Sequence, residues 1–370
     1  MADGIFWKTK FMKIAVIGAG IYGCTIALKL ANEGFDVDLI EKESDIMMVT
    51  TPISLRAHAG YFYARSEDTM LSCKENSEIF QKEYPGGVVD GSTHYYMIAK
   101  NGSKISGKEF LTMLDKNKFT YKKTKEPLVN EDLIDECVIV DEYSYDPDQL
   151  RIEVKRKLSL SKVNLLLNTD VSKISFTNYD LKIIAGYASN NDIARMITGE
   201  TIQEYEYRFC EKVVVKLPEE FNNKNFVVLD GPFFQIDPIG EKGNLFALSH
   251  FGYSIHSRHE GNFFDIDPEK RNLLGKGIVK NPSITNATQI IEEISKYIPK
   301  VKKAKIVGSL FAVKPIIPKE PTDARPVIIK TLRKDVLSIL SGKVAGSIPA
   351  AEECLKYAKK MKKSLGKSKK

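Results

Sequence analysis

Three glycines followed by a glutamate form the pattern with the clearest chemistry in this chain. Gly18, Gly20 and Gly23 follow the apolar residues 13–17 in the spacing Gly-x-Gly-x-x-Gly. The first glycine permits a tight turn, the second lets the backbone approach a pyrophosphate, and the third lets a helix pack closely on a strand. Glu41 lies about 20 residues further on, where a carboxylate accepts hydrogen bonds from a ribose hydroxyl. The pattern therefore predicts a dinucleotide site with its phosphates at a helix N-terminus.

The surrounding segments have the periodicities that a βαβ unit requires. Residues 13–17 are rich in Ile and Val, which is typical of a buried parallel strand, and residues 21–31 carry an apolar stripe at helical spacing. A turn at Glu33-Gly34 precedes a second strand, residues 36–40, which ends directly before Glu41. Lys42 follows and completes the set of cofactor-binding candidates in this unit.

Composition limits the class of protein. The 370 residues are 43% hydrophobic and 28% charged, as in a globular protein, and the chain is long enough for two interleaved lobes. No apolar stretch reaches the roughly 20 residues of a membrane helix. The five cysteines are scattered and lack a Cys-x-x-Cys pair, so we expect no metal site, no disulfide framework and a cytoplasmic location. The net charge of +7 is concentrated in a lysine-rich tail, which is typical of a solvated helix end, so we expect no nucleic-acid partner.

A polar and aromatic loop follows the second strand. Residues 50–66 are predicted to form an ordered loop that contacts a ligand, rather than a third strand. This loop contains Arg56, His58 and Tyr61. His58 is the one candidate for a catalytic residue. It could donate a hydrogen bond to the cofactor, act as a general base or form a covalent link to the cofactor. The alternative is that His58 only stabilises the loop. Arg56 is a candidate for balancing cofactor charge, with a structural salt bridge as the alternative.

The rest of the chain alternates expected strands and helices. We expect helices over residues 71–84, 149–158 and 286–297 and at the C-terminal end. We expect strands over residues 93–99, 163–167, 170–174, 209–215, 305–313 and 336–340.

This order of elements resembles that of the FAD-dependent D-amino-acid oxidase superfamily, particularly its glycine-oxidase and sarcosine-oxidase-like branch. The resemblance extends from Met12 to about Tyr357. Its most discriminating part is Lys314-Pro315 followed by Thr322-Asp323-Ala324-Arg325-Pro326-Val327-Ile328, which is similar to the Arg-Pro, Thr-x-Asp, Pro-x-Ile-Gly region of that family.

The resemblance implies an α/β fold in which a Rossmann-type FAD-binding domain is interleaved with a β-rich substrate domain. The FAD-binding domain would comprise residues 12–85, 141–217 and 320–370, and the substrate domain residues 86–140 and 218–319. Ser341-Gly342-Lys343 would bring a second helix N-terminus to the flavin, so Gly342 and Lys343 join the cofactor-binding candidates, together with Val171. The flavin-linking cysteine of the family is absent near Lys314, so we expect non-covalent FAD.

The same resemblance implies where a substrate would bind. Relatives use an arginine at the position of Lys314 to pair with a substrate carboxylate, and a lysine offers a point charge instead of a planar fork. We therefore expect a small substrate with an anionic group near Lys314. Tyr61, His250 and Tyr253 are further candidates for the pocket, although aromatic residues at the end of a strand more often close a β-lobe.

These observations favour an FAD-dependent oxidoreductase that oxidises a C–N or C–O bond of a small polar metabolite. An amino acid is one candidate substrate. An amino sugar is the other, because residues 56–61, 63–66 and 230–233 resemble members of the superfamily associated with amino-sugar gene clusters. The electron acceptor is left open. Two alternatives remain: an NAD-dependent dehydrogenase, which the missing early third strand disfavours, and a tRNA-modifying flavoprotein, which would use the lysine-rich tail.

Overall fold

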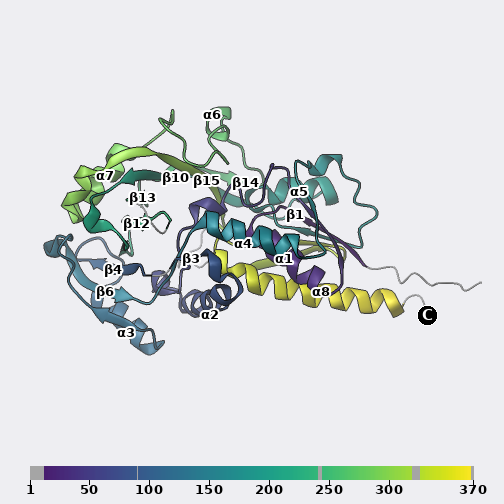
Figure 1. Ribbon diagram of the computed structural model, residues 1–370, viewed down its shortest axis with the longest axis horizontal. Helices are drawn as coiled ribbons and strands as arrows, with labels where there is room; N and C mark the ends of the chain where they lie inside the picture. Colours follow the sequence, from purple (N-terminus) through teal and green to yellow (C-terminus); the bar gives the residue numbers. More distant parts are fainter. Residues whose placement is uncertain (1–11, 90, 241–243, 319–325, 368–370) are drawn as a thin grey trace, which may run out of the picture.

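Two β-sheets organise the chain, and the segments between them cross from one sheet to the other several times (Figure 1). The computed structural model describes residues 12–89, 91–240, 244–318 and 326–367. Within these residues no helix is long and apolar enough to cross a lipid bilayer.

The first sheet has six strands in the order β16-β17-β9-β1-β2-β8, parallel except for β16. Its strands are β1 (Lys13–Ile17), β2 (Asp36–Ile40), β8 (Asn164–Leu166), β9 (Leu181–Ile184), β16 (Ile328–Arg333) and β17 (Val336–Leu340). The central strand β1 is almost entirely buried, which explains its unbroken run of apolar residues.

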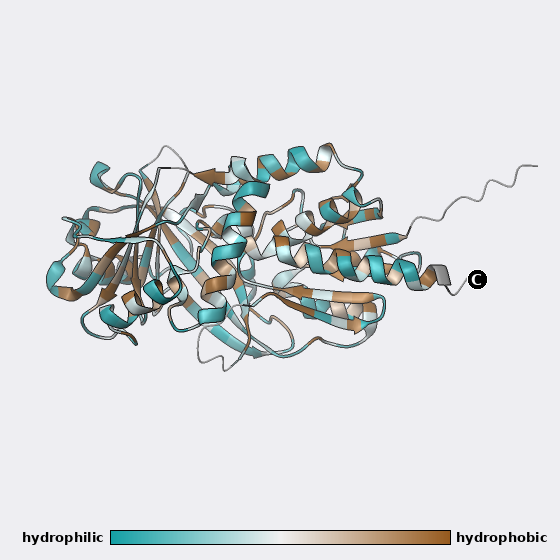
Figure 2. Ribbon diagram, turned by 90° about the horizontal axis from the view of Figure 1, so that it is seen from below, coloured by the Kyte–Doolittle hydropathy of each residue, from teal (hydrophilic) through white to brown (hydrophobic). Residues whose placement is uncertain are grey.

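Helices cover both faces of this sheet. Ile14 and Val16 pack with α1 (Ile21–Asn32), α4 (Pro147–Ser159) and α8 (Ser347–Lys367), whereas Ala15 and Ile17 pack with α5 (Asn190–Thr198). Helix α8 runs along α1 in Figure 1, and in Figure 2 it alternates hydrophilic and hydrophobic residues along its length, as expected for a helix with one buried face. Helix α2 (Glu67–Glu83) packs near the start of α8.

The second sheet has nine strands in the order β14-β10-β13-β12-β11-β4-β6-β5, with β15 paired to β10. Its strands are β4 (Thr93–Ala99), β5 (Tyr121–Lys123), β6 (Ile134–Val140), β10 (Tyr205–Lys216), β11 (Lys224–Leu229), β12 (Phe234–Pro238), β13 (Leu245–His250), β14 (Ile255–Gly261) and β15 (Lys305–Ile316). Helix α7 (Ala287–Tyr297) covers one face of this sheet, and α3 (Gly107–Lys116) packs on β4 and β6. Helix α6 (Pro268–Arg271) is a single turn. The short strands β3 (Val88–Val89) and β7 (Ser144–Tyr145) pair with each other in a separate two-stranded sheet.

The register of β10 decides which side chains of this sheet face α7. Val213 is opposite Leu248 of β13, and both pack against α7. Because side chains alternate along a strand, Lys212 lies on the other face. Arg208 is an even number of residues before Lys212, so both side chains lie on the same face of β10. Arg208 is directly opposite Lys314 of β15, and opposite residues of paired strands share a face. Lys212 and Lys314 therefore both lie on the face that α7 does not cover.

The expected fold class is confirmed, and most expected elements form. Two expectations are wrong. Residues 171–173 form a single 3-10 turn rather than a strand, because the Asp170 side chain accepts the Ser172 N–H and closes the turn. The domain boundary at residue 217 also fails, since β10 is a strand of the second sheet; its apolar pattern predicts a strand but not the sheet to which it belongs. The other boundaries stay a prediction, and Thr322–Arg325 lie outside the described residues.

Candidate active site

A cavity of about 550 Å³ opens at the carboxyl ends of β1 and β2. The segments after β9, residues 185–189, and after β17, residues 341–344, also line it. In an open α/β sheet a ligand binds at this edge, outside the carboxyl ends of the strands on either side of the central strand.

The glycine turn at the cavity has the geometry of a phosphate site. Gly18 has φ +101°, and a Cβ there would lie 2.7 Å from the Ala185 carbonyl oxygen. A Cβ on Gly23 would lie 1.8 Å from the Gly18 carbonyl oxygen, so only glycine lets α1 pack this closely on the turn. A Cβ on Gly20 would meet nothing within 4 Å, because this residue borders the open cavity. Gly20 is also the N-cap of α1 and provides no side-chain cap, so the first N–H groups of the helix are available to a ligand.

Glu41 is held at the same end of the cavity by two backbone N–H groups. Its Oε2 accepts the Ala19 N–H at 2.7 Å, and its Oε1 accepts the Glu43 N–H at 3.0 Å. Both oxygens keep a lone pair that a ribose hydroxyl would use. Lys42 and Val171 line the cavity beside it. Backbone donors for phosphate and an oriented carboxylate for a ribose are the groups that fit the adenosine diphosphate part of FAD.

Gly342 and Lys343 line the other end of the cavity. The Lys343 Nζ lies 3.9 Å from the centroid of the Tyr63 ring, and no carboxylate of the described residues pairs with it. Burial lowers the pKa of Lys343 to about 7. An ammonium without an anion at a cavity wall fits a cofactor that brings phosphate or carbonyl oxygens.

His58 lies close to Lys343 on the loop before α2. It adopts the left-handed conformation, with φ +50°, and packs against Phe62 and Tyr63. Its Nδ1 is buried and has no hydrogen-bond partner among the described residues. Burial lowers the pKa of His58 well below 6.5, and the positive charges of Lys343, Arg56, Lys212 and Lys314 lower it further. The imidazole is therefore neutral, and the positive charges of these four residues favour that state.

Lys314 and Lys212, whose charges act on this imidazole, lie on strands β15 and β10 of the second sheet. Lys314 is partly buried, and its side chain has no ion pair or hydrogen bond among the described residues. The Lys212 side chain is 12% exposed, and its Nζ lies 3.1 Å from Asp237 Oδ2. Lys212 was not among the site residues predicted from the sequence. The strand pattern around residues 209–215 was visible, but only the register shows that Lys212 shares a face with Lys314.

Arg56 does not reach the cavity. Its buried guanidinium pairs with Asp237, and its Nη1 lies 3.8 Å from Glu142 Oε2. Its Nη2 donates to the carbonyl oxygens of Phe226 and Ile236. The expectation of a cofactor contact is therefore wrong, and the salt-bridge alternative describes this residue.

The three aromatic candidates for the substrate pocket are also placed elsewhere. Tyr61 is buried against Phe119 and donates its hydroxyl to the Thr120 carbonyl oxygen at 2.7 Å. His250 is opposite Phe234 on the face that α7 covers, and its Nδ1 accepts the Gly252 N–H. Tyr253 packs on the His250 ring at 5.1 Å between centroids. These rings close the β-lobe, because the direction of a side chain depends on register and not on residue type.

Comparison with known proteins agrees with this geometry. The model of the FAD dependent oxidoreductase family matches residues 13–96. The FAD-dependent monooxygenase kojA of Aspergillus flavus is 25% identical over 379 residues, covering 92% of this chain and 84% of the monooxygenase.

Two solved structures share the fold over nearly the whole chain. FAD-bound L-α-glycerophosphate oxidase of Mycoplasma pneumoniae superposes with a TM-score of 0.72 at 15% identity, covering 94% of each chain. Glycine oxidase of Geobacillus kaustophilus superposes with a TM-score of 0.69 at 12% identity, covering 95% of each chain. The matched family, the full-length relative and the fit of the cavity lead to one assignment. The chain is an FAD-dependent oxidoreductase whose residues 13–96 match the FAD dependent oxidoreductase family and whose fold is shared with glycine oxidase and glycerophosphate oxidase.

Proposed function

We propose that this enzyme oxidises a C–O or C–N bond of a small anionic metabolite, with His58 as the proton acceptor and Lys314 as the cation that binds the anion. Bound FAD supplies the acceptor for the hydride that leaves the substrate carbon. The observation that carries the proposal is the buried Nδ1 of His58, which has no hydrogen-bond partner among the described residues and lies in the field of several positive charges.

The two lysines on the second sheet support an anionic substrate. An ammonium removed from water costs free energy unless an anion is near it, and Lys314 has no such partner among the described residues. Lys212 adds a second positive charge on the same sheet face, although it shares Asp237 with Arg56. A carboxylate or phosphate group of the substrate would supply the missing anion. The names of glycine oxidase and glycerophosphate oxidase both describe small molecules that carry such a group.

His58 has the protonation state that a base needs. Its lowered pKa keeps the imidazole neutral near pH 7, so it accepts the proton of a substrate hydroxyl or ammonium as the hydride leaves the adjacent carbon. The substrate loses a hydride and a proton, so a hydroxyl substrate becomes a carbonyl and an ammonium substrate becomes a protonated imine. An anion bound between the lysines would offset their charge and raise the proton affinity of His58, so the base would be strongest with substrate bound.

The test is anaerobic reduction of the FAD-loaded protein by a panel of hydroxy acids, amino acids, phosphate esters and amino sugars. The visible absorbance of oxidised flavin should be lost only with compounds that carry an anionic group. The Lys314→Met variant should weaken binding of the active compound about 10- to 100-fold, as expected for a hydrogen bond to a charged group. Lys305→Met, on the exposed end of the same strand, is the matched control.

Two outcomes would contradict the proposal. One is reduction by uncharged compounds as fast as by anionic ones. The other is unchanged substrate binding in Lys314→Met. The role of His58 is tested separately: His58→Asn should keep its FAD and lose most of the reduction rate at saturating substrate, and a rate equal to that of the wild type would remove His58 from the mechanism.

A further inference from the structure

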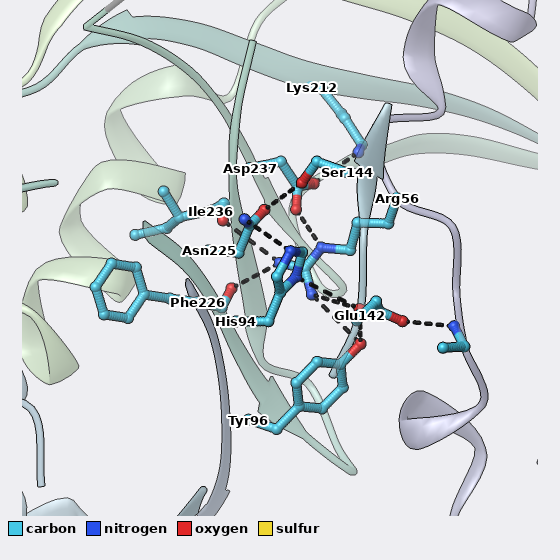
Figure 3. Close-up of polar contacts among 11 residues, drawn as sticks. Arg56, His94, Tyr96, Glu142, Ser144, Lys212, Asn225, Phe226, Ile236 and Asp237 are labelled. Atoms are coloured by element: carbon cyan, nitrogen blue, oxygen red, sulfur yellow. Dashed lines mark hydrogen bonds and ion pairs between the residues drawn. The ribbon is translucent and has the colours of Figure 1, made fainter. Parts of the chain in front are cut away.

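A buried chain of charges joins Arg56, on the loop before α2, to residues on and beside the second sheet (Figure 3). It consists of Glu142, Arg56, Asp237 and Lys212, and we call it the buried charge chain. Arg56 lies between the two carboxylates and pairs with both. Lys212 pairs with the free oxygen of Asp237. The four residues come from segments far apart in the sequence, and neither carboxylate side chain is more than 1% exposed.

One end of this chain holds the backbone beside His58. Glu142 Oε1 accepts the N–H of Ala59 at 2.7 Å, and Glu142 Oε2 accepts the Tyr96 hydroxyl at 2.6 Å. Ala59 directly follows His58, which is in the left-handed conformation. A residue other than glycine rarely adopts that conformation unless its surroundings impose it. The hydrogen bond from Ala59 fixes the peptide plane that sets the direction of the imidazole.

The middle of the chain anchors the same loop on the second sheet. Besides its ion pairs, Arg56 forms an isolated β-bridge with Ser144, and the Ala57 N–H donates to the Tyr143 carbonyl oxygen at 2.9 Å. Burial opposes the charge of Asp237, but Arg56 and Lys212 together lower its pKa. Asp237 therefore stays ionised and ties the loop of His58 to Lys212.

Stability alone does not explain this arrangement. A buried ion pair is weak evidence for stability, because well-packed apolar residues of similar volume often serve as well. In the buried charge chain, each carboxylate faces Arg56 with one oxygen and binds an element of the candidate active site with its other oxygen. Glu142 contacts the backbone next to His58, and Asp237 contacts Lys212.

We propose that Glu142 is a positioning residue for His58, and that Asp237, through Arg56, links this loop to the cation Lys212. The roles of His58 and Lys212 rest on the proposed function, but the positioning itself does not need a substrate. Loss of Glu142 releases the Ala59 N–H and lets the imidazole of His58 turn. Loss of the Asp237 charge loosens Arg56 and Lys212 together.

The experiment measures the loop directly in the FAD-loaded protein. Hydrogen exchange reports the Ala59 amide, and the imidazole NMR signal of His58, assigned by its absence in His58→Asn, reports the ring. In Glu142→Ala we expect Ala59 to exchange at least tenfold faster and the His58 signal to shift. Glu142→Gln should restore part of the protection, since a neutral amide accepts a hydrogen bond about half as strong. Asp237→Asn should shift the His58 signal as well.

Glu211→Gln is the matched control. Glu211 is an equally buried carboxylate of the same lobe, but it accepts from His256, Ser309 and Thr285 and does not contact the loop. It should leave Ala59 and His58 unchanged. Wild-type exchange and an unshifted His58 signal in folded Glu142→Ala would overturn the proposal. If Glu142→Ala does not fold, unchanged exchange in Glu142→Gln would overturn it. Neither result depends on finding the substrate, so the proposed function would stand or fall separately.

Discussion

Lys343 should make the binding of FAD depend on pH. Without cofactor its pKa is about 7, against an ordinary value of about 10.4, because burial disfavours the ammonium. About 3% of the side chains would then be protonated at about pH 8.5. FAD brings oxygen acceptors into the cavity that Lys343 lines, and these restore the ordinary pKa. Binding near this pH should therefore take up close to one proton.

The sign and size follow from linkage. Because the bound state holds more protons than the free state above about pH 7, the dissociation constant of FAD should rise with pH. The rise is at most about tenfold per pH unit, or about 1.4 kcal/mol, up to the pKa in the bound state. In the protein without FAD, Lys343 is protonated in the unfolded state but largely neutral in the folded state between about pH 7 and pH 10. The free-energy cost of burying Lys343 should therefore fall, and the free energy of unfolding should rise, as pH rises through this range.

Calorimetric titration of the FAD-free protein with FAD, in two buffers of different ionisation enthalpy, counts the protons. We expect close to one proton for the wild type at about pH 8.5 and none for Lys343→Met. Lys42→Met is the control, because Lys42 lines the same cavity but is exposed and should leave the proton count unchanged. A wild type that binds FAD without proton uptake, at a pH-independent affinity, would refute the reasoning.

Three further predictions concern the cofactor. Glu41→Ala should raise the dissociation constant of FAD about 10- to 100-fold, since hydrogen bonds to the carboxylate are lost, and an unchanged protein-to-flavin absorbance ratio would contradict this. Acid precipitation should leave the yellow colour in solution; colour in the pellet would indicate a covalent link, with His58 as the suspect. Gly23→Ala should destabilise the fold by about 1–3 kcal/mol or more and abolish FAD binding, because its Cβ would lie 1.8 Å from a backbone oxygen. Gly20→Ala should melt like the wild type, and equal melting temperatures for the two variants would show that the close packing is unimportant.

The local parts of the site could be predicted from the sequence. Gly18, Gly20 and Glu41 lie within one βαβ unit, and short-range geometry fixes their positions. Lys343 was expected at the cofactor because the resemblance implies that the turn before the last helix meets the flavin. The structure places all four at one cavity.

The second half of the site depends on long-range pairing, which the sequence did not reveal. Arg56 meets Asp237 across 181 positions, and Glu142 meets the Ala59 N–H across 83. Nothing near Glu142 distinguishes it from a surface glutamate. His250 was a reasonable candidate by residue type, but the register of β13 turns it toward α7. Side chains whose direction depends on sheet register were therefore the ones mispredicted or missed.

The order of strands in the first sheet also has a consequence for the synthesis of the protein. The strand β1 pairs with β2 soon after both are made, but its other neighbour β9 follows more than a hundred residues later, and β17 completes that edge near the end of the chain. Ribosomes add about 5–20 residues per second, so β1 would wait for about 8 to 33 seconds with an unpaired, apolar edge. Of the cavity walls, the one that contains Lys343 is translated last. The FAD cavity is therefore complete only after residue 344 has been made, and until then the unpaired edge strands of the nascent chain are the main hazard for aggregation.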